Sequence, residues 1–333
     1  MKRPARTLTI TLLSVALLIL TMISLNAGKV WIPLSIWLDH FSGGQAADSR
    51  WEIIFQLRLP RTLLGIFIGG SLGLLGAVMQ GYTRNPLADP ALLGISSMAA
   101  FGAVLSLYLG LAIQSFWLLP GMAMAGAFIG ILVLLALSGI SSSLITFILA
   151  GIILNSVAAA GVALALNLAP NPWAVNEIVN WLMGSLADRS FDDLLIALPF
   201  ITVGCVLLLG TRRALDALTF GETGARSLGV NMAATRWLVA IGAGLATGAG
   251  VAVTGVIGFV GLVTPHLLRP LVGARPGGLL IPSALGGAVI ILAADILVRL
   301  IPSVIEIKLG VAMAILGGPF FLVLLLSMRR RVI

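Results

Sequence analysis

The chain has 333 residues, of which 59% are hydrophobic and only 10% are charged, and its mean hydropathy is +1.12. A soluble domain carries roughly 25% charged residues, so this composition excludes a water-soluble fold and predicts a single membrane domain over residues 1–333. The net charge of +8 does not indicate a nucleic-acid partner, because the Lys and Arg residues lie in short hydrophilic gaps without interleaved aromatic residues.

The first predicted element is an apolar run from about Leu8 to Leu25, which follows the basic residues Lys2, Arg3 and Arg6. A signal peptide has the same order of charge and apolarity, but its apolar core spans only about 7 to 15 residues. The longer run therefore favours a first transmembrane helix that is retained in the protein.

Ten segments are apolar enough to cross a bilayer as helices, which takes about 20 residues for each crossing. Strands of a membrane barrel would alternate over about ten residues, so the uninterrupted runs predict an all-α, polytopic membrane protein. The predicted spans, of which the eighth is short and rich in glycine, are 8–26, 62–80, 92–112, 116–137, 144–168, 193–210, 236–254, 256–270, 279–298 and 309–327.

The basic residues predict that both termini lie in the cytoplasm. With ten spans the termini share a side, and Lys and Arg collect in cytoplasmic loops. The inner side then holds Lys2, Arg3, Arg6, Arg84, Arg212, Arg213, Arg226, Arg236, Arg269, Arg275, Arg329, Arg330 and Arg331. The outer side holds fewer, namely Lys29, Arg50, Arg58, Arg61, Arg189, Arg299 and Lys308. Most acidic residues accompany the outer group, including Asp39, Asp48, Glu52, Glu177, Asp188, Asp192 and Asp193.

Two predicted spans carry small residues at every fourth position, which places those residues on one helix face. Such a face lets helix backbones approach closely where lipid supplies no hydrophobic drive. The faces are Gly65, Gly69, Gly73 and Ala77 in the second span, and Gly242, Ala246, Gly250 and Thr254 in the seventh. We interpret both as packing devices.

Motifs of an enzymatic or metal site are missing from the sequence. No segment reads G-x-x-x-x-G-K-[ST], the loop that cradles ATP phosphates, and the Gly28-Lys29 pair is followed by valine. His40 and His266 lie far apart, outside any zinc-ligand spacing. Cys205 is the single cysteine of the chain, so an intrachain disulfide is excluded, and it lies in an apolar run. We therefore predict no catalytic residues, no metal site and no bound cofactor.

One acidic residue, Asp295, lies deep within a predicted span. A charged group at this depth is costly, so it either serves proton coupling or has a partner. Arg299 follows four residues later, and on a helix the two side chains share a face. We interpret the pair as a structural ion pair near the outer surface, with a proton relay as the alternative.

Four stretches in order resemble the FecCD family of ATP-binding cassette (ABC) importer permeases. They read RLPRTLLGIFIGGSLGLLGAVMQGYTRNPLADPALLGIS at 58–96, FGETGARSLGVN at 220–231, GFVGLVTPHLLRPLVG at 258–273 and LGVAMAILGGPFFLVLL at 309–325. The resemblance covers nearly the whole chain from about Gln56. It implies a ten-helix (type II) importer subunit that pairs as a homodimer in the bacterial inner membrane.

The resemblance also implies partners and cargo. Two ATP-binding cassette subunits would bind ATP and Mg on the cytoplasmic side, and a periplasmic binding protein would deliver an iron-siderophore, haem or cobalamin. The sequence does not distinguish these substrates, because no span holds a cluster of basic or ligating residues.

Carried over residue by residue, the resemblance assigns three sites. The ATPase-coupling site lies within the loop at about 212–236 and comprises Gly221, Glu222, Ala225, Arg226, Leu228 and Gly229. The docking site for the binding protein comprises Arg58, Arg61 and Arg299. The gate and path comprise Ser141, Ser142, Ser143 and Asn155, with the fifth and tenth spans at the dimer axis. For the Asn85 to Pro90 loop we expect Asn85 and Asp89 to cap turns, whether or not the loop contacts the ATPase.

Two positions depart from the family pattern. Val256 stands where members often have proline, and Glu306 to Gly310 lacks the proline of the E-[LI]-P-x-G turn.

Two other functions compete with the importer permease. A secondary transporter should show coupling carboxylates or broken-helix ion sites at mid-depth, and a structural membrane scaffold would not need the ordered coupling motif.

Overall fold

The computed structural model describes residues 4–28, 30–33, 36, 49–139, 144–302 and 306–329, and every regular element within these ranges is a helix. The longest apolar helices are α1 (Pro4–Asn26), α4 (Leu59–Tyr82), α7 (Leu118–Ser138), α8 (Leu144–Asn167), α10 (Phe191–Gly210), α13 (Met232–Thr254) and α15 (Pro276–Leu300). Three further apolar helices are α5 (Ile95–Tyr108), α14 (Val260–Val272) and α16 (Leu309–Arg329). Each matches one of the ten predicted spans, so the predicted all-α membrane fold is confirmed.

Some predicted helix ends were wrong. The predicted span 92–112 is shortened to α5, because Pro90–Leu93 forms a separate 3₁₀ turn (η2) and Gly94 adopts φ 70°. A second left-handed glycine, Gly110, ends α5 with φ 67° and starts the short α6 (Leu111–Gln114). Only glycine adopts this backbone region readily.

The second span begins earlier than the predicted 62. A short helix α3 (Ser49–Glu52) and a π-helical turn η1 (Ile53–Arg58) run without a break into α4, giving a continuous helix over Arg50–Tyr82. Pro60 lies in the first turn of α4, directly after the π-helical turn, so the continuous helix changes its hydrogen-bonding pattern next to the residue that lacks an N–H.

Helix α9 (Pro172–Leu182) was not predicted. Its 11 residues are too few to span a bilayer. It begins where the Asn171 side chain accepts a hydrogen bond from the Ala174 N–H at 2.9 Å, an N-cap geometry. The exposed Trp173 and the buried Ile178 lie on opposite faces, so α9 is an amphipathic element between two spans.

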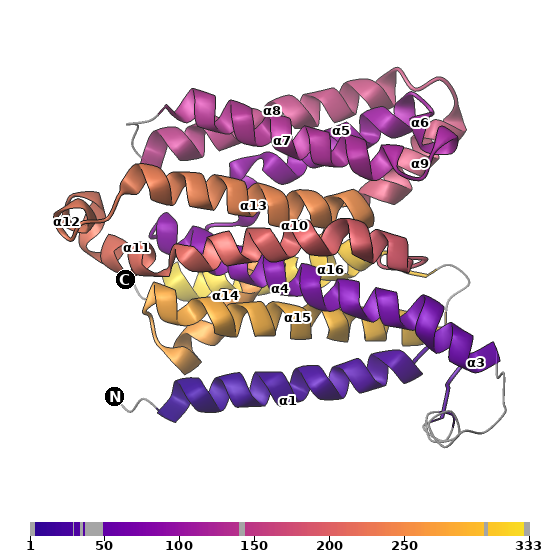
Figure 1. The fold of residues 1–333 in the computed structure, drawn as a ribbon, viewed down its shortest axis with the longest axis horizontal. Helices are drawn as coiled ribbons and strands as arrows, with labels where there is room; N and C mark the ends of the chain where they lie inside the picture. Colours follow the sequence, from indigo (N-terminus) through magenta and orange to yellow (C-terminus); the bar gives the residue numbers. More distant parts are fainter. Residues whose placement is uncertain are drawn as a thin grey trace.

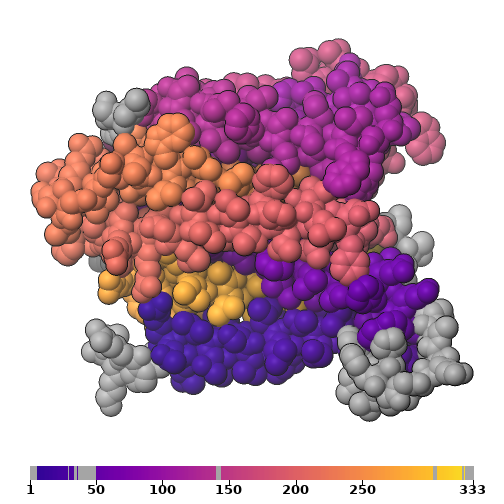
Figure 2. Space-filling view, viewed as in Figure 1, coloured from indigo at the N-terminus to yellow at the C-terminus, as the bar shows by residue number. Residues whose placement is uncertain are grey.

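The helices run side by side along one direction (Figure 1). The most buried spans are α4 and α13, and α4 packs against α10, α14 and α15. Helices α5, α7 and α8 form a layer on one side, and α1 lies along the opposite edge (Figures 1 and 2). Both chain ends lie at the same end of the bundle as α12 (Gly221–Ser227), which the predicted even number of crossings requires (Figure 1).

The two small-residue faces form close helix contacts. On α4, a Cβ added at Gly73 would overlap the Ser283 carbonyl oxygen of α15, and one added at Gly69 would meet the backbone of Gly287. On α13, Gly242 faces Gly204 of α10. These contacts confirm the packing interpretation.

Candidate functional site

The outer end of the bundle holds a network of buried ions, the outer arginine cluster, made of Arg58, Arg61, Arg299, Asp295 and Glu306. Arg61 donates to Asp295 through Nη2 at 2.7 Å and Nε at 3.1 Å, and also pairs with Glu306. Asp295 pairs with Arg299 at 3.0 Å, which confirms the predicted ion pair. Asp295 therefore lies between two guanidinium groups, and nothing in this geometry favours a proton relay.

Burial distinguishes the members of the cluster. The Asp295 side chain is 1% exposed, Arg299 6% and Arg61 11%, whereas Glu306 is 29% exposed. Burying ions is costly unless each is paired and hydrogen-bonded, so removing one partner would leave an uncompensated charge. Glu306 is the member that is most accessible from outside.

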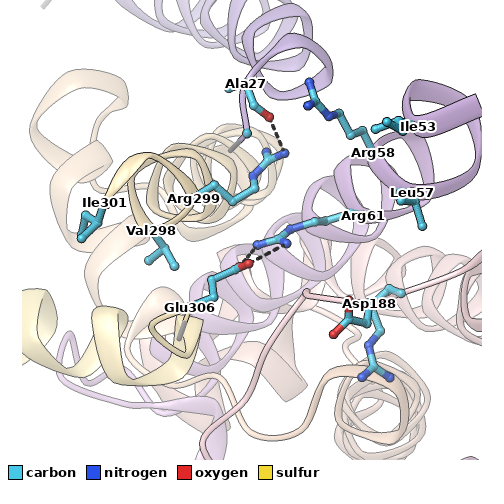
Figure 3. A pocket seen from close by; sticks show the side chains of 12 residues that line it. Ala27, Ile53, Leu57, Arg58, Arg61, Asp188, Val298, Arg299, Ile301 and Glu306 are labelled. Atoms are coloured by element: carbon cyan, nitrogen blue, oxygen red, sulfur yellow. Dashed lines mark hydrogen bonds and ion pairs between the residues drawn. The ribbon is translucent and has the colours of Figure 1, made fainter. Parts of the chain in front are cut away.

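Two arginines of the cluster also bind the end of α1. Arg58 donates to the carbonyl oxygens of Leu25, Asn26 and Val30 at 3.1, 2.7 and 2.6 Å. Arg299 donates to the carbonyl oxygens of Ser24 and Ala27, at 3.0 and 3.2 Å (Figure 3). The last carbonyls of a helix lack intrahelical donors and carry partial negative charge, so cations stabilise this end.

A cavity of about 210 Å³ adjoins the cluster (Figure 3). Its polar lining includes Arg58, Arg61, Asp188, Arg189, Arg299 and Glu306. Sequence reasoning missed Glu306 as the partner of Arg61, because 245 residues separate them. A usable signal was present, since arginines at the outer ends of the spans need acceptors and the predicted topology places Glu306 on the same side.

At the opposite end, residues 212–229 form a compact segment, which we call the coupling segment. It consists of α11 (Arg212–Ala217), a 3₁₀ turn η3 (Leu218–Phe220) and α12. Gly221 separates η3 from α12 with φ 86°, and Gly229 ends α12 with φ 82°. The Asn231 side chain then accepts from the Ala234 N–H at 3.0 Å and starts α13.

The coupling segment has a buried side and an exposed side. Leu218 and Ala225 are at most 1% exposed and anchor it to the core. Phe220 and Leu228 are 74% and 63% exposed, which is unusual for large apolar side chains on a loop at the membrane surface. Figure 2 shows the segment standing out at the end of the bundle.

Ion pairs tie this segment to its surroundings. Asp216 of α11 accepts from Arg275 Nε and from the Gly277 N–H, both at 2.8 Å, which fastens α11 to the start of α15. Within α12, Arg226 lies 4.0 Å from Glu222. Glu222 Oε1 also accepts from the backbone N–H of Leu144, the first residue of α8, at 3.1 Å. This last contact was not foreseen from the sequence.

The residues assigned to the path lie on α8 and the connection before it. Ser141, Ser142 and Ser143 lie outside the described residues. Asn155 of α8 accepts a hydrogen bond from the Ser97 hydroxyl of α5 at 2.5 Å, and its side chain is exposed in the single chain. A cavity of about 320 Å³ beside it has an almost wholly apolar lining that includes Ala158 and Val256.

The loop between α4 and α5 is capped as predicted. The Asn85 side chain accepts from the Leu87 N–H at 2.9 Å, and the Asp89 side chain accepts from the Ala91 N–H at 2.8 Å. Burial raises the pKa of Asp89, and the bond from Ala91 opposes that rise.

Among the described residues, no three His, Cys, Asp or Glu side chains gather as a metal site would require.

Comparisons with known proteins agree with this architecture. Residues 16–327 match the FecCD transport family. The chain is 38% identical to the hemin transport system permease protein HmuU of Yersinia pestis, covering 96% of this chain and 95% of that protein. It is 36% identical to the vitamin B12 import system permease protein BtuC of Klebsiella pneumoniae, covering 96% and 93%. A solved structure described as a metal-chelate type ABC transporter in an inward-facing conformation matches with a TM-score of 0.85 and 34% identity, covering 96% and 98%.

Proposed function

Because this chain belongs to the FecCD transport family, we propose that it forms the translocation path for an iron chelate, haem or cobalamin. It is a multi-pass membrane permease subunit of an ABC importer, and the subunit itself is a transporter component rather than an enzyme. Residues 1–333 act as one transmembrane domain, placed in the bacterial inner membrane with both termini in the cytoplasm.

The observation that carries this proposal is the exposed apolar side of the coupling segment. Phe220 and Leu228 are exposed on the segment with the E-x-x-A-x-x-L-G pattern, and α12 of this segment lies at the end of the bundle where α1 begins (Figure 1). An apolar patch of this kind fits a docked protein better than water. We assign its partner as the ATP-binding cassette subunit that binds ATP and Mg.

The assembly follows from the same reasoning. Two permease copies and two ATPase subunits would form the importer, with α8 and α16 of each copy at the shared axis. Ser141 to Ser143 and Asn155 would line the inner gate and the path between the copies. Large apolar side chains on α8 and α16 that are exposed in the single chain, among them Ile153, Val157, Leu316 and Val323, suit a second copy or lipid.

A secondary transporter finds no support. The similar proteins are ABC permeases, and the buried Asp295 is held between Arg61 and Arg299 rather than poised to exchange an ion. A scaffold without transport would leave the projecting coupling segment without a role.

The ATPase assignment is tested by co-purification. The tagged permease is expected to bring down a separate ATP-binding chain, and Phe220→Ser with Leu228→Ser is expected to lose it, because the exposed apolar contact is removed. Ile113→Ser, an exposed apolar residue at the opposite end of the bundle, serves as the matched control. Full uptake by cells that lack every ATPase partner would refute the assignment.

For the outer side, we propose that Arg58, Arg61 and Arg299 receive acidic side chains of the periplasmic binding protein. Arginine suits carboxylates because its guanidinium binds them in bidentate fashion. Here the chain's own Asp295 and Glu306 already occupy Arg61, and Glu306 is the more accessible of the two. An incoming carboxylate would therefore replace Glu306.

Changing all three arginines to glutamate is expected to weaken capture of the binding protein in a low-salt pull-down, because it removes the cations that would meet the partner's carboxylates and also the Arg58 and Arg299 bonds that hold the end of α1. The control is Asp295→Asn, which disturbs the internal network but keeps the three cations. We expect it to lower thermal stability and to retain capture. If the triple variant captured the binding protein as well as the wild type, the docking assignment would be wrong.

A further inference from the structure

The connection from α7 to α8 is held at both of its ends by side chains from other helices. At its start, the Gly139 carbonyl oxygen accepts from Arg236 Nη1 of α13 at 2.8 Å. At its end, the Leu144 N–H donates to Glu222 Oε1 of α12 at 3.1 Å. Gly139 is 97 residues from Arg236, and Leu144 is 78 residues from Glu222, so both contacts are tertiary.

The Glu222 contact matches what a helix start requires. The first N–H groups of α8 have no acceptor within the helix, and the partial positive charge there favours an anion. A hydrogen bond to a charged acceptor is about twice as strong as one between neutral groups. The carboxylate is partly shielded, since the Glu222 side chain is 26% exposed.

Aromatic packing fixes the next turn of α8 to the same region. The ring of Phe147 meets the buried ring of Tyr82 of α4 edge to face, with centroids 5.8 Å apart. The Tyr82 hydroxyl lies near the Arg236 guanidinium of α13. The first turns of α8 therefore contact α4 and α12 through specific side chains, while Arg236 of α13 holds Gly139 at the end of α7.

Helix α12 thus has one side exposed and one side in contact with the rest of the protein. Its exposed side, with Arg226, faces away from the protein, whereas Ala225 is fully buried and Glu222 reaches α8. Glu222 is the residue through which a displacement of α12 would reach the main chain of α8 directly.

We propose that Glu222 is a positioning residue, whose carboxylate joins the coupling segment to the first turn of α8 so that movement of α12 is passed to α8. This inference rests on the proposed function and refines it. The resemblance places Glu222 in the ATPase-coupling motif, and the structure directs its side chain toward the permease's own path helix.

The first measurement is the hydrogen-exchange rate of the Leu144 amide, which reports its hydrogen bond to Glu222. It uses the isolated chain reconstituted in lipid nanodiscs. In Glu222→Ala this amide is expected to exchange at least about tenfold faster than in the wild type, because its acceptor is lost. Glu222→Gln keeps an acceptor oxygen and is expected to exchange at nearly the wild-type rate. Arg226→Gln, which removes the neighbouring ion pair and leaves the contact, serves as the matched control.

The second measurement asks whether the contact transmits motion, using the permease assembled with its ATPase subunits. Wild type is expected to show a change in exchange at the start of α8 when ATP binds, and so is Ser227→Ala, which alters an exposed side chain of α12 outside the coupling motif. Glu222→Ala is expected to lose that change in complexes that still contain the ATPase subunits by co-purification, which a role in docking alone would not produce.

Unchanged Leu144 exchange in Glu222→Ala would overturn the proposal, and so would a nucleotide response at α8 equal to that of the wild type. Failure of the proposed function would be seen separately. A wild-type chain that binds no ATPase subunit contradicts the importer assignment. The exchange rate of Leu144 in the isolated chain would still test the contact between Glu222 and α8.

Discussion

Replacing Glu222 by arginine is expected to abolish substrate uptake while leaving the chain inserted in the membrane. The new cation would face the partially positive start of α8 instead of accepting from the Leu144 N–H. It would also stand next to Arg226, so the ion pair within α12 becomes a repulsion. The coupling segment is small and lies at the bundle's end, so the ten apolar spans should still insert (Figure 1).

Uptake into reconstituted vesicles measures the transport effect, and protease accessibility of the loops measures insertion. Glu222→Gln is the control, because it has nearly the same size and can still accept a hydrogen bond; it is expected to retain a large part of the uptake. Wild-type transport by Glu222→Arg would show that the segment does not couple ATP hydrolysis to movement.

Adding a single methyl group at Gly73 is expected to destabilise the helix bundle. The Cβ of Gly73→Ala would overlap the Ser283 carbonyl oxygen of α15, so the α4 and α15 backbones would have to separate. Overpacking of this kind costs about 1–3 kcal/mol. We expect the upper end, because both contacting groups belong to helix backbones and cannot change rotamer.

Gly70→Ala gives a closely matched comparison on the same helix. Its Cβ would lie 3.5 Å from the Ala284 carbonyl oxygen, an ordinary van der Waals contact. Alanine also favours helix over glycine by about 1 kcal/mol, so this variant should be neutral or slightly more stable. Thermal unfolding followed by size-exclusion chromatography in detergent reports both, and equal stability of the two variants would contradict the assigned α4–α15 contact.

The sequence predicted the helical spans well because crossing a bilayer demands long apolar runs, and hydropathy reads these directly. Ends were less predictable, since glycine occurs throughout the spans and only some glycines, such as Gly94 and Gly110, take the left-handed conformation that limits a helix. Helix α9 escaped prediction because a short amphipathic helix has neither the length nor the apolarity of a span.

Site residues were easier to identify than their partners. The arginines of the outer cluster and the motif around Glu222 could be selected from the sequence, because their residue types and spacing carry the family pattern. Glu306 as the second partner of Arg61, and the Leu144 N–H as the partner of Glu222, could not be selected. Both contacts join segments that only the tertiary fold brings together, and one of them involves a backbone atom, which leaves no trace in residue identity.

The attachment of α1 has a consequence for how this part of the protein tolerates change. Arg58 and Arg299 hold its end almost entirely through main-chain oxygens, which every amino acid supplies. Exchanging one side chain for another around Leu25 to Ala27 would leave those acceptors in place. Inserting or deleting one residue would rotate them away from both guanidinium groups, so this stretch should keep a constant length, while burial of Leu25 and Ala27 limits the size of the side chains it accepts.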